Sequence, residues 1–247
     1  MESIRDVLGG KSLEEKIAWM EKNPPKGLKL GEKAGKDLSE TCERCGGFVH
    51  DEAPGEGKHC RCDSRLRRCR ELVEAADPGG RMTFENMDGG HPTQLRAAKL
   101  ARAVALDGWQ GLGMFGTPGT GKTHTAVAAV RLALSQGVDA GFYNVVEFVA
   151  RVQDTYSGEG SRSAILESVG GREMVVLDDL GKEHRSPNVE SIVYELVDKL
   201  YRAKRRLIVC SNLTPDAYAE RYDDAVRSRI AGMCEFVAVK GEDRRRA

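Results

Sequence analysis

A glycine-rich motif at residues 116–123 constrains this chain more than any other feature. It reads Gly116-Thr117-Pro118-Gly119-Thr120-Gly121-Lys122-Thr123 and fits the pattern G-x-x-x-x-G-K-[ST] at every specified position. Residues 111–115 before it favour a short buried strand, and residues 124–134 after it favour a helix. In that context backbone N–H groups close around phosphate oxygens at a helix N-terminus. The motif predicts a nucleoside triphosphate site, with Lys122 at the β- and γ-phosphates and the Thr123 hydroxyl on Mg²⁺.

From about residue 81 onward, apolar runs alternate with helical patterns. Strands are predicted over 111–115, 140–145, 174–177, 206–210 and 236–239, and helices over 91–106, 124–134, 146–156, 188–204, 215–221 and 224–230. Short apolar strands separated by helices favour a mainly parallel sheet covered on both faces. With a phosphate-binding loop after its first strand, this α/β region is predicted to be a doubly wound P-loop NTPase core.

A second motif supplies carboxylates at the end of an apolar strand. Residues 174–177 are followed directly by Asp178 and Asp179. We expect this strand to lie beside the P-loop strand, so that Asp178 faces the Mg²⁺ bridging the phosphates and Asp179 polarises the attacking water. The alternative is a pair of acids that merely starts a surface loop.

Two further elements follow along the chain. Ser211-Asn212 comes directly after a predicted strand, and ligands of open α/β sheets bind beyond the carboxyl ends of strands. Asn212 is therefore a candidate for contact with the γ-phosphate or the lytic water, although a strand followed by Ser-Asn is more often a turn. Residues 223–230 contain Arg229, and an arginine supplied by a neighbour stabilises phosphoryl transfer; the alternative is a solvated helix face.

These four elements, in this order, resemble the AAA+ ATPases and more closely the DnaC/DnaI-type replicative helicase loaders and their IstB relatives. The similar stretches are 116–124 with its trailing His124, 175–181, 210–213 and 228–230. The resemblance covers roughly residues 81–240. It implies Arg229 as an arginine finger acting in trans. It also implies an ATPase that self-associates through its core, lies on single-stranded DNA and engages a DnaB-type hexameric helicase. Because the chain stops soon after the last predicted strand, we expect the helical lid to be absent.

Five of the seven cysteines crowd into one stretch. Cys42-x-x-Cys45 and Cys60-x-Cys62 form two close pairs, which suit a tetrahedral, structural Zn²⁺ site. His59 or Cys69 could replace one ligand, and free thiols or an iron–sulfur cluster are the other interpretations. Cys210 and Cys234 stand among apolar residues and are predicted to be buried small hydrophobes. The expected organisation is an N-terminal helix and linker (1–38), a zinc module (39–80) and the AAA+ core (81–247).

Composition adds only broad limits. The 247 residues carry no net charge, so any nucleic-acid surface must be local. No signal peptide and no membrane span are expected, which favours a cytoplasmic protein. Candidates for DNA contact are Phe148, Arg151, Tyr156 and Arg162, although aromatic residues at helical spacing more often belong to the core.

Three functions remain open at this point. The first is the helicase loader, and the second is an IstB-like ATPase assisting a transposase on duplex DNA. The third is a zinc adaptor whose nucleotide site only switches conformation. A zinc module beside a short helix is better suited to docking on another protein, which favours the helicase loader over the transposition ATPase.

Overall fold

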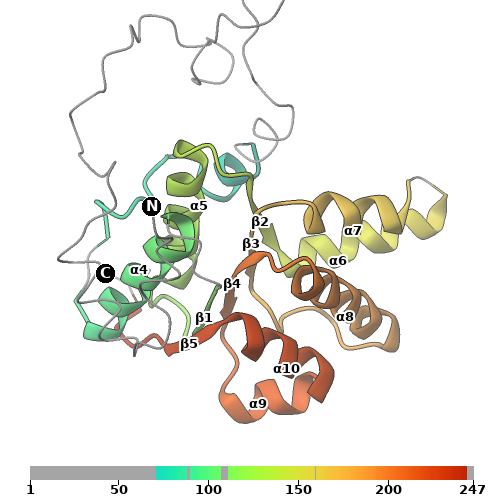
Figure 1. Ribbon diagram of the computed structural model, residues 1–247. Helices are drawn as coiled ribbons and strands as arrows, with labels where there is room; N and C mark the ends of the chain where they lie inside the picture. The colour runs from blue at the N-terminus through green and yellow to red at the C-terminus, as the bar shows by residue number, and fades with distance from the viewer. Residues whose placement is uncertain (1–70, 88–89, 107–110, 159, 244–247) are drawn as a thin grey trace, which may run out of the picture. The chain divides into compact units, whose positions relative to one another are not determined.

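The computed structural model describes residues 71–87, 90–106, 111–158 and 160–243, all of which belong to one compact unit, Arg61–Ala247. Its centre is a five-stranded sheet in which every strand pairing is parallel (Figure 1). The strands are β1 (Gly111–Phe115), β2 (Ala140–Asn144), β3 (Met174–Asp178), β4 (Arg206–Ser211) and β5 (Glu235–Ala238). Their order in the sheet is β2-β3-β4-β1-β5. The predicted mainly parallel α/β core is confirmed.

Helices cover the two faces of the sheet, as Figure 1 shows. They are α4 (Pro92–Leu106), α5 (Lys122–Ser135), α6 (Val145–Asp154), α7 (Arg162–Gly170), α8 (Pro187–Arg202), α9 (Pro215–Arg221) and α10 (Asp224–Met233), with a 3-10 turn at Thr155–Ser157. α4 and α5 pack together on one face. On the other face α6, α7, α8 and α10 share an apolar cluster with strand residues such as Val175 and Leu207.

The position of β3 corrects one prediction. β3 does not lie beside the P-loop strand β1, because β4 is inserted between them. Asp178 still reaches the P-loop, since the start of α5 lies over the carboxyl ends of the neighbouring strands, where Thr123 contacts it. The register aligns Asn144 with Asp178 and Phe115 with Ser211. The polar ends of β2, β3 and β4 and the P-loop therefore meet along one edge of the sheet.

Local sequence signals explain where most helices begin. The side chains of Asn144, Ser161, Ser186, Thr214 and Asp223 each accept a hydrogen bond from a backbone N–H in the first turn of the helix that follows. Such caps satisfy donors that have no partner within the helix. They fix the start of five helices, four of which the sequence pattern predicted to within two residues.

The fifth helix, α7, was missed by the sequence reading. Its apolar positions are few, and only Leu166, Val169 and Gly170 are buried. A weakly amphipathic segment of nine residues offers little periodicity to detect. The helix is held by its Ser161 cap and by packing against α8 rather than by a strong pattern of its own.

Residues 71–77 also pack on the core. Residues 71–76 are helical, and Val73 within them is buried. Asp77 accepts hydrogen bonds from the backbone N–H groups of Arg81 and Met82 and pairs with Arg131 of α5 at 3.0 Å. Burial alone would raise the pKa of Asp77, but these hydrogen bonds and the Arg131 charge outweigh it and hold the pKa below its ordinary value. This anchor fixes the chain just before the expected boundary.

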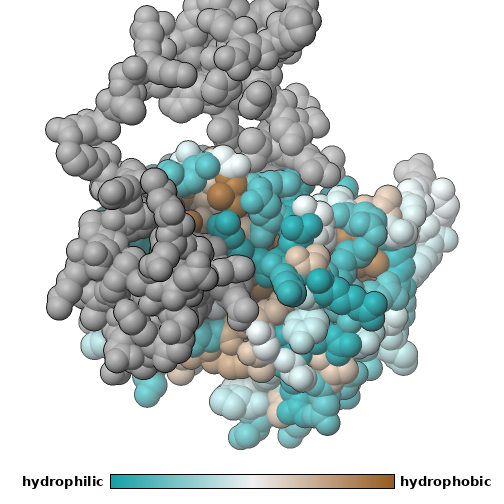
Figure 2. All heavy atoms as spheres, in the orientation of Figure 1, coloured by the Kyte–Doolittle hydropathy of each residue, from teal (hydrophilic) through white to brown (hydrophobic). Residues whose placement is uncertain are grey.

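The face shown in Figure 2 is mostly hydrophilic, with apolar side chains in small patches. Among the described helices, none combines the length and the apolar character that crossing a membrane requires.

Candidate functional site

The P-loop connects β1 to α5 through three glycines with positive φ. The φ angles are 156° at Gly116, 79° at Gly119 and 87° at Gly121, a region that side chains with a Cβ rarely adopt. Gly121 is also the N-cap residue of α5. The Gly116 N–H donates to the carbonyl of Ser211 at 3.2 Å, which ties the loop to the end of β4. The glycines thus allow the loop to wrap its backbone around an anion at a helix N-terminus.

Lys122 is held across this loop. Its Nζ donates to the carbonyls of Gly116 (2.8 Å) and Thr117 (2.7 Å), and only 6% of the residue is exposed. Burial lowers the pKa of Lys122, and the negative charge of Asp178 partly opposes that effect. The ammonium group is therefore held beside the phosphate-binding loop by that loop's own backbone carbonyls.

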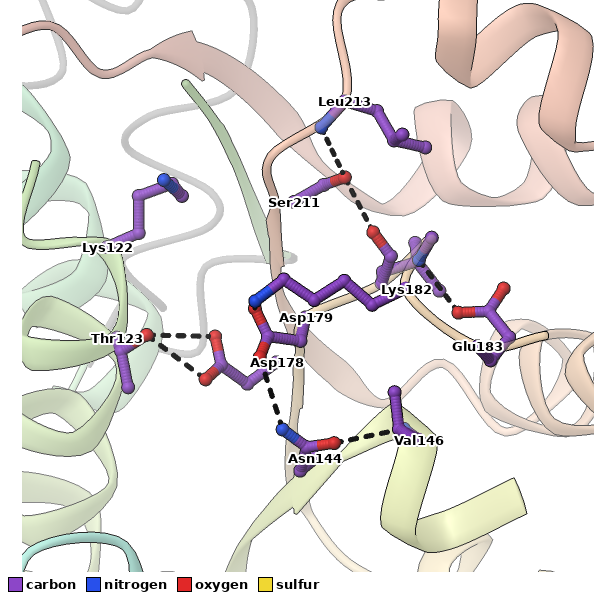
Figure 3. A network of polar contacts seen from close by, with 12 residues as sticks. Lys122, Thr123, Asn144, Val146, Asp178, Asp179, Lys182, Glu183, Ser211 and Leu213 are labelled. Atoms are coloured by element: carbon purple, nitrogen blue, oxygen red, sulfur yellow. Dashed lines mark hydrogen bonds and ion pairs between the residues drawn. The ribbon is translucent and has the colours of Figure 1, made fainter. Parts of the chain in front are cut away.

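Thr123 and Asp178 form the second half of the arrangement. The Thr123 hydroxyl donates to both carboxylate oxygens of Asp178, at 3.1 and 3.3 Å (Figure 3). Burial and the neighbouring charge of Asp179 raise the pKa of Asp178. A hydroxyl and a carboxylate facing each other are hard oxygen donors, and Mg²⁺ uses one or two such protein ligands together with substrate phosphates. These residues fit Mg²⁺.

Asp179 occupies a constrained turn directly after β3. Its φ is 58°, unusual for a residue other than glycine. One carboxylate oxygen pairs with Lys182 Nζ at 2.8 Å, and the other accepts from Asn144 Nδ2 at 3.3 Å. Both contacts are visible in Figure 3. Sequence reasoning did not single out Asn144 or Lys182, although a polar residue at the end of a strand was a usable signal.

Asn212 and Arg229, two further predicted site residues, make no hydrogen bond or ion pair with this cluster among the described residues. Asn212 follows β4 and is partly exposed, and no side-chain hydrogen bond involves it within the described part of the chain. Its neighbour Ser211 is buried, and the Ser211 hydroxyl donates to the Leu180 carbonyl at 2.6 Å. Ser211 therefore joins the turn after β3 to the end of β4.

Arg229 lies on α10 and is held by α8. Its Nε donates to Asp198 at 2.9 Å and its Nη2 to the Tyr194 hydroxyl at 3.3 Å. The guanidinium also lies over the Tyr194 ring, 5.1 Å from its centroid. No contact joins Arg229 to the P-loop among the described residues, so the fold does not bring it into the site of its own chain.

A buried ion pair, also missed from the sequence, fixes the turn after β3. Glu183 accepts from Arg221 Nη2 at 2.9 Å, from the Tyr222 hydroxyl at 2.5 Å and from the Gly181 N–H at 2.8 Å. The Glu183 side chain is 1% exposed and that of Arg221 10%. This pair links the loop that carries Asp179 to the end of α9.

The segment after β5 lies against the P-loop. The Val239 N–H donates to the Phe115 carbonyl at 2.7 Å, and the Lys240 N–H donates to Thr93 at 2.9 Å. A Cβ placed on Gly119 would lie 1.9 Å from Asp243 Oδ1. Gly119 is thus required by close approach as well as by its φ angle.

The candidate DNA contacts divide into buried and exposed residues. Phe148 is 5% exposed and belongs to the apolar cluster, so the prediction that it stacks on bases is wrong. Tyr156 is 55% exposed, and its hydroxyl accepts from Arg162 at 2.9 Å. Arg162 also pairs with Glu195 at 2.8 Å, while Arg151 is exposed on α6.

The predicted zinc ligands Cys42, Cys45, Cys60 and Cys62 lie outside the described residues. Within those residues, no group of three or more His, Cys, Asp or Glu side chains is arranged to hold a metal ion. Cys210 and Cys234 are free and buried, as predicted for small apolar residues.

Comparisons with known proteins agree with this geometry. The Buchnera aphidicola (Schizaphis graminum) replicative helicase loader DnaC is 26% identical over 136 residues, which cover 53% of this chain and 55% of that protein. Its Escherichia coli K12 counterpart is 24% identical over 152 residues, covering 60% and 62%. The chain thus spans little more than half the length of these relatives.

A solved structure and a family signature extend the comparison. The crystal structure of the DnaC helicase loader superposes with a TM-score of 0.59 at 25% identity, covering 64% of this chain and 97% of that one. The likeness confirms the predicted AAA+ P-loop NTPase core. The signature of the family described as IstB-like ATP binding protein matches residues 58–247, more than half of the chain. The chain therefore belongs to the IstB-like ATP-binding protein family.

Proposed function

We propose that this protein is an ATP-dependent loader that binds a DnaB-type hexameric helicase and delivers it onto single-stranded DNA. The observation that carries the nucleotide part is the contact of Thr123 with Asp178 beside a preset Lys122. The relatives named as replicative helicase loaders support the choice of partner.

The site residues have complementary roles in ATP hydrolysis. P-loop N–H groups and Lys122 bind the phosphates, and Thr123 and Asp178 hold Mg²⁺, which neutralises charge on the β- and γ-phosphates when bound. The water oxygen forms a bond to the γ-phosphorus as the bond to the bridging oxygen breaks, and that electron pair leaves with ADP. Asp179 orients the water and takes its proton. Asn212, at the end of β4, contacts the γ-phosphate or the water.

Arg229 acts on the site of a neighbouring copy in this proposal. A cation supplied in trans stabilises the charge of the transferring phosphoryl group, and self-association through the ATPase core would place it there. Asp198 and Tyr194 support a fixed guanidinium orientation. Single-stranded DNA would track the assembly, with Arg151, Tyr156 and Arg162 as candidate contacts.

The N-terminal region provides the docking device. Cys42, Cys45, Cys60 and Cys62 would bind a structural Zn²⁺, whose binding energy would supply much of the folding energy of so small a module. A module of this kind is suited to holding the helicase.

The second candidate is an ATPase that assists a transposase on duplex DNA, and the IstB-like signature favours it. The experiment that separates the two mixes the purified chain with the DnaB-type helicase of its own source and ATP, and measures the mass of the complex. A discrete helicase-hexamer-plus-loader species supports the loader. Separate proteins, with ATP-dependent filaments on duplex DNA, support the transposition ATPase.

A further inference from the structure

Lys182 is the one basic side chain that the turn after β3 directs back at the carboxylates of the site. The Lys182 N–H donates to the Asp179 carbonyl at 3.1 Å, which closes a tight turn. Asp179 and Gly181 both have positive φ within it. The side chain of Lys182 then folds over Asp179 and pairs with Oδ1 at 2.8 Å.

The backbone of the turn is hydrogen-bonded on both sides of Lys182. The Leu180 N–H donates to the Cys210 carbonyl at 2.9 Å, and the Leu180 carbonyl accepts from Ser211. Beyond the turn, Glu183 is buried and accepts from the Gly181 N–H. The backbone that carries Lys182 is therefore fixed to β4 and to α9.

The Lys182 ammonium group lies beside the carboxylate that directly follows Asp178, the predicted Mg²⁺ ligand. Figure 3 shows the Lys182 side chain extending from its loop toward the side on which Lys122 and Thr123 lie. Half of the Lys182 side chain remains exposed, which leaves it free to change partner.

Lys182 and Asn144 each contact one carboxylate oxygen of Asp179. A carboxylate whose two oxygens are engaged in this way is poorly placed to receive a proton from water. The γ-phosphate of ATP carries more negative charge than one carboxylate. Lys122 and Thr123, which would bind the phosphates and their Mg²⁺, lie on the side toward which the Lys182 side chain extends (Figure 3). The Lys182 ammonium group would therefore be attracted more strongly to the γ-phosphate than to Asp179 when a triphosphate binds.

We propose that Lys182 is a γ-phosphate-binding residue that exchanges its ion pair with Asp179 for the γ-phosphate when ATP binds, freeing Asp179 to contact water. This inference rests on the proposed ATPase function. Lys182 would then determine the preference for a triphosphate over a diphosphate, because ADP has no γ-phosphate with which the ammonium group can pair.

The test compares binding of a non-hydrolysable ATP analogue and of ADP, each with Mg²⁺, to the full chain by calorimetry. Lys182→Met is expected to weaken analogue binding about tenfold, the order expected for one charge-assisted hydrogen bond, and to leave ADP binding within about twofold. Lys182→Arg should restore most of the discrimination, since it keeps the charge. Arg185→Met, which removes an exposed cation from the same loop, is the matched control and should change neither affinity.

The outcomes separate this inference from the proposed function. Equal losses for the analogue and ADP in Lys182→Met, or no loss for either, overturn the role of Lys182 while wild-type binding of Mg·ATP still supports the nucleotide site. Failure of the wild-type chain to bind either nucleotide overturns the proposed function itself. A lower melting temperature for Lys182→Met without a change in the ratio of the two affinities would make Lys182 a structural residue and would also overturn the inference.

Discussion

The buried pair Glu183–Arg221 gives the most direct test of how the fold holds the loop after β3. We consider Arg221→Met, which keeps much of the side-chain volume and removes the charge. Glu183 would then remain buried with only the Gly181 N–H and the Tyr222 hydroxyl as donors. Breaking a buried ion pair from one side costs about 3–5 kcal/mol, because a buried charge is left uncompensated.

The structure places the expected cost at the lower end of that range. Two neutral donors to Glu183 remain, and Arg221 itself has Nε and Nη1 buried without a partner among the described residues, so its removal also relieves a penalty. We therefore expect a loss of about 3 kcal/mol, which corresponds to roughly 6–12 °C in melting temperature for a domain of this size. Thermal unfolding followed by circular dichroism measures it.

A double variant and a control make the argument refutable. Glu183→Gln combined with Arg221→Met removes both charges and should be more stable than Arg221→Met alone by at least about 1 kcal/mol. Arg185→Met breaks the exposed Arg185–Glu190 pair and should cost no more than about 0.5 kcal/mol. If the double variant is no more stable than Arg221→Met, or if Arg221→Met costs no more than Arg185→Met, the reasoning from burial is refuted.

Three further predictions concern the site and the cysteines. Because the pKa of Asp178 is raised above its ordinary value of 3.8, protons compete with Mg²⁺ for this carboxylate at a higher pH, and Mg²⁺-dependent nucleotide binding should weaken on acidification. Asp179→Asn removes a charge that helps to raise the pKa of Asp178. In calorimetric titrations this variant should therefore lose binding only at lower pH. Gly119→Ala should lower both the melting temperature and the affinity for ATP, because the new Cβ would collide with Asp243. Gly137 has a similar positive φ but open space where a Cβ would lie, so Gly137→Ala should lower only the stability, by about 1–2 kcal/mol. Elemental analysis should find about one zinc ion per chain, lost when Cys42 and Cys45 are changed to Ser; zinc retained in that double variant would contradict the predicted ligands.

The sequence predicted the core of this fold well because its signals are local. The P-loop motif and the apolar runs mark the five strands, and polar caps mark most helix starts. The order of the strands is not local: nothing in the run 174–178 reveals that β4 inserts between β3 and β1. Strand order depends on crossovers between distant segments, so the strand that carries Asp178 was expected beside the wrong neighbour, although Asp178 and Thr123 were predicted to serve the same Mg²⁺.

The site shows the same division. Lys122, Thr123 and Asp178 were predictable because their motifs fix residue type and spacing. Asn144 and Lys182, the partners of Asp179, were not, since only the register of β2 with β3 and the left-handed turn bring them to it. Phe148 was a candidate for DNA contact because a single aromatic residue in a helix does not disclose which face is buried. In the structure it lies in the core, the alternative that its helical spacing also allowed.

The most direct test of the central claim is helicase loading onto closed circular single-stranded DNA. A ring helicase cannot thread onto a circle that has no free end, so displacement of an annealed oligonucleotide reports opening and delivery of the ring. With ATP and the DnaB-type helicase of its source, the wild-type chain is predicted to produce displacement, and the Lys122→Ala variant, which lacks the cation held across the P-loop, is predicted to produce none. Displacement that is the same with and without this protein would contradict the account.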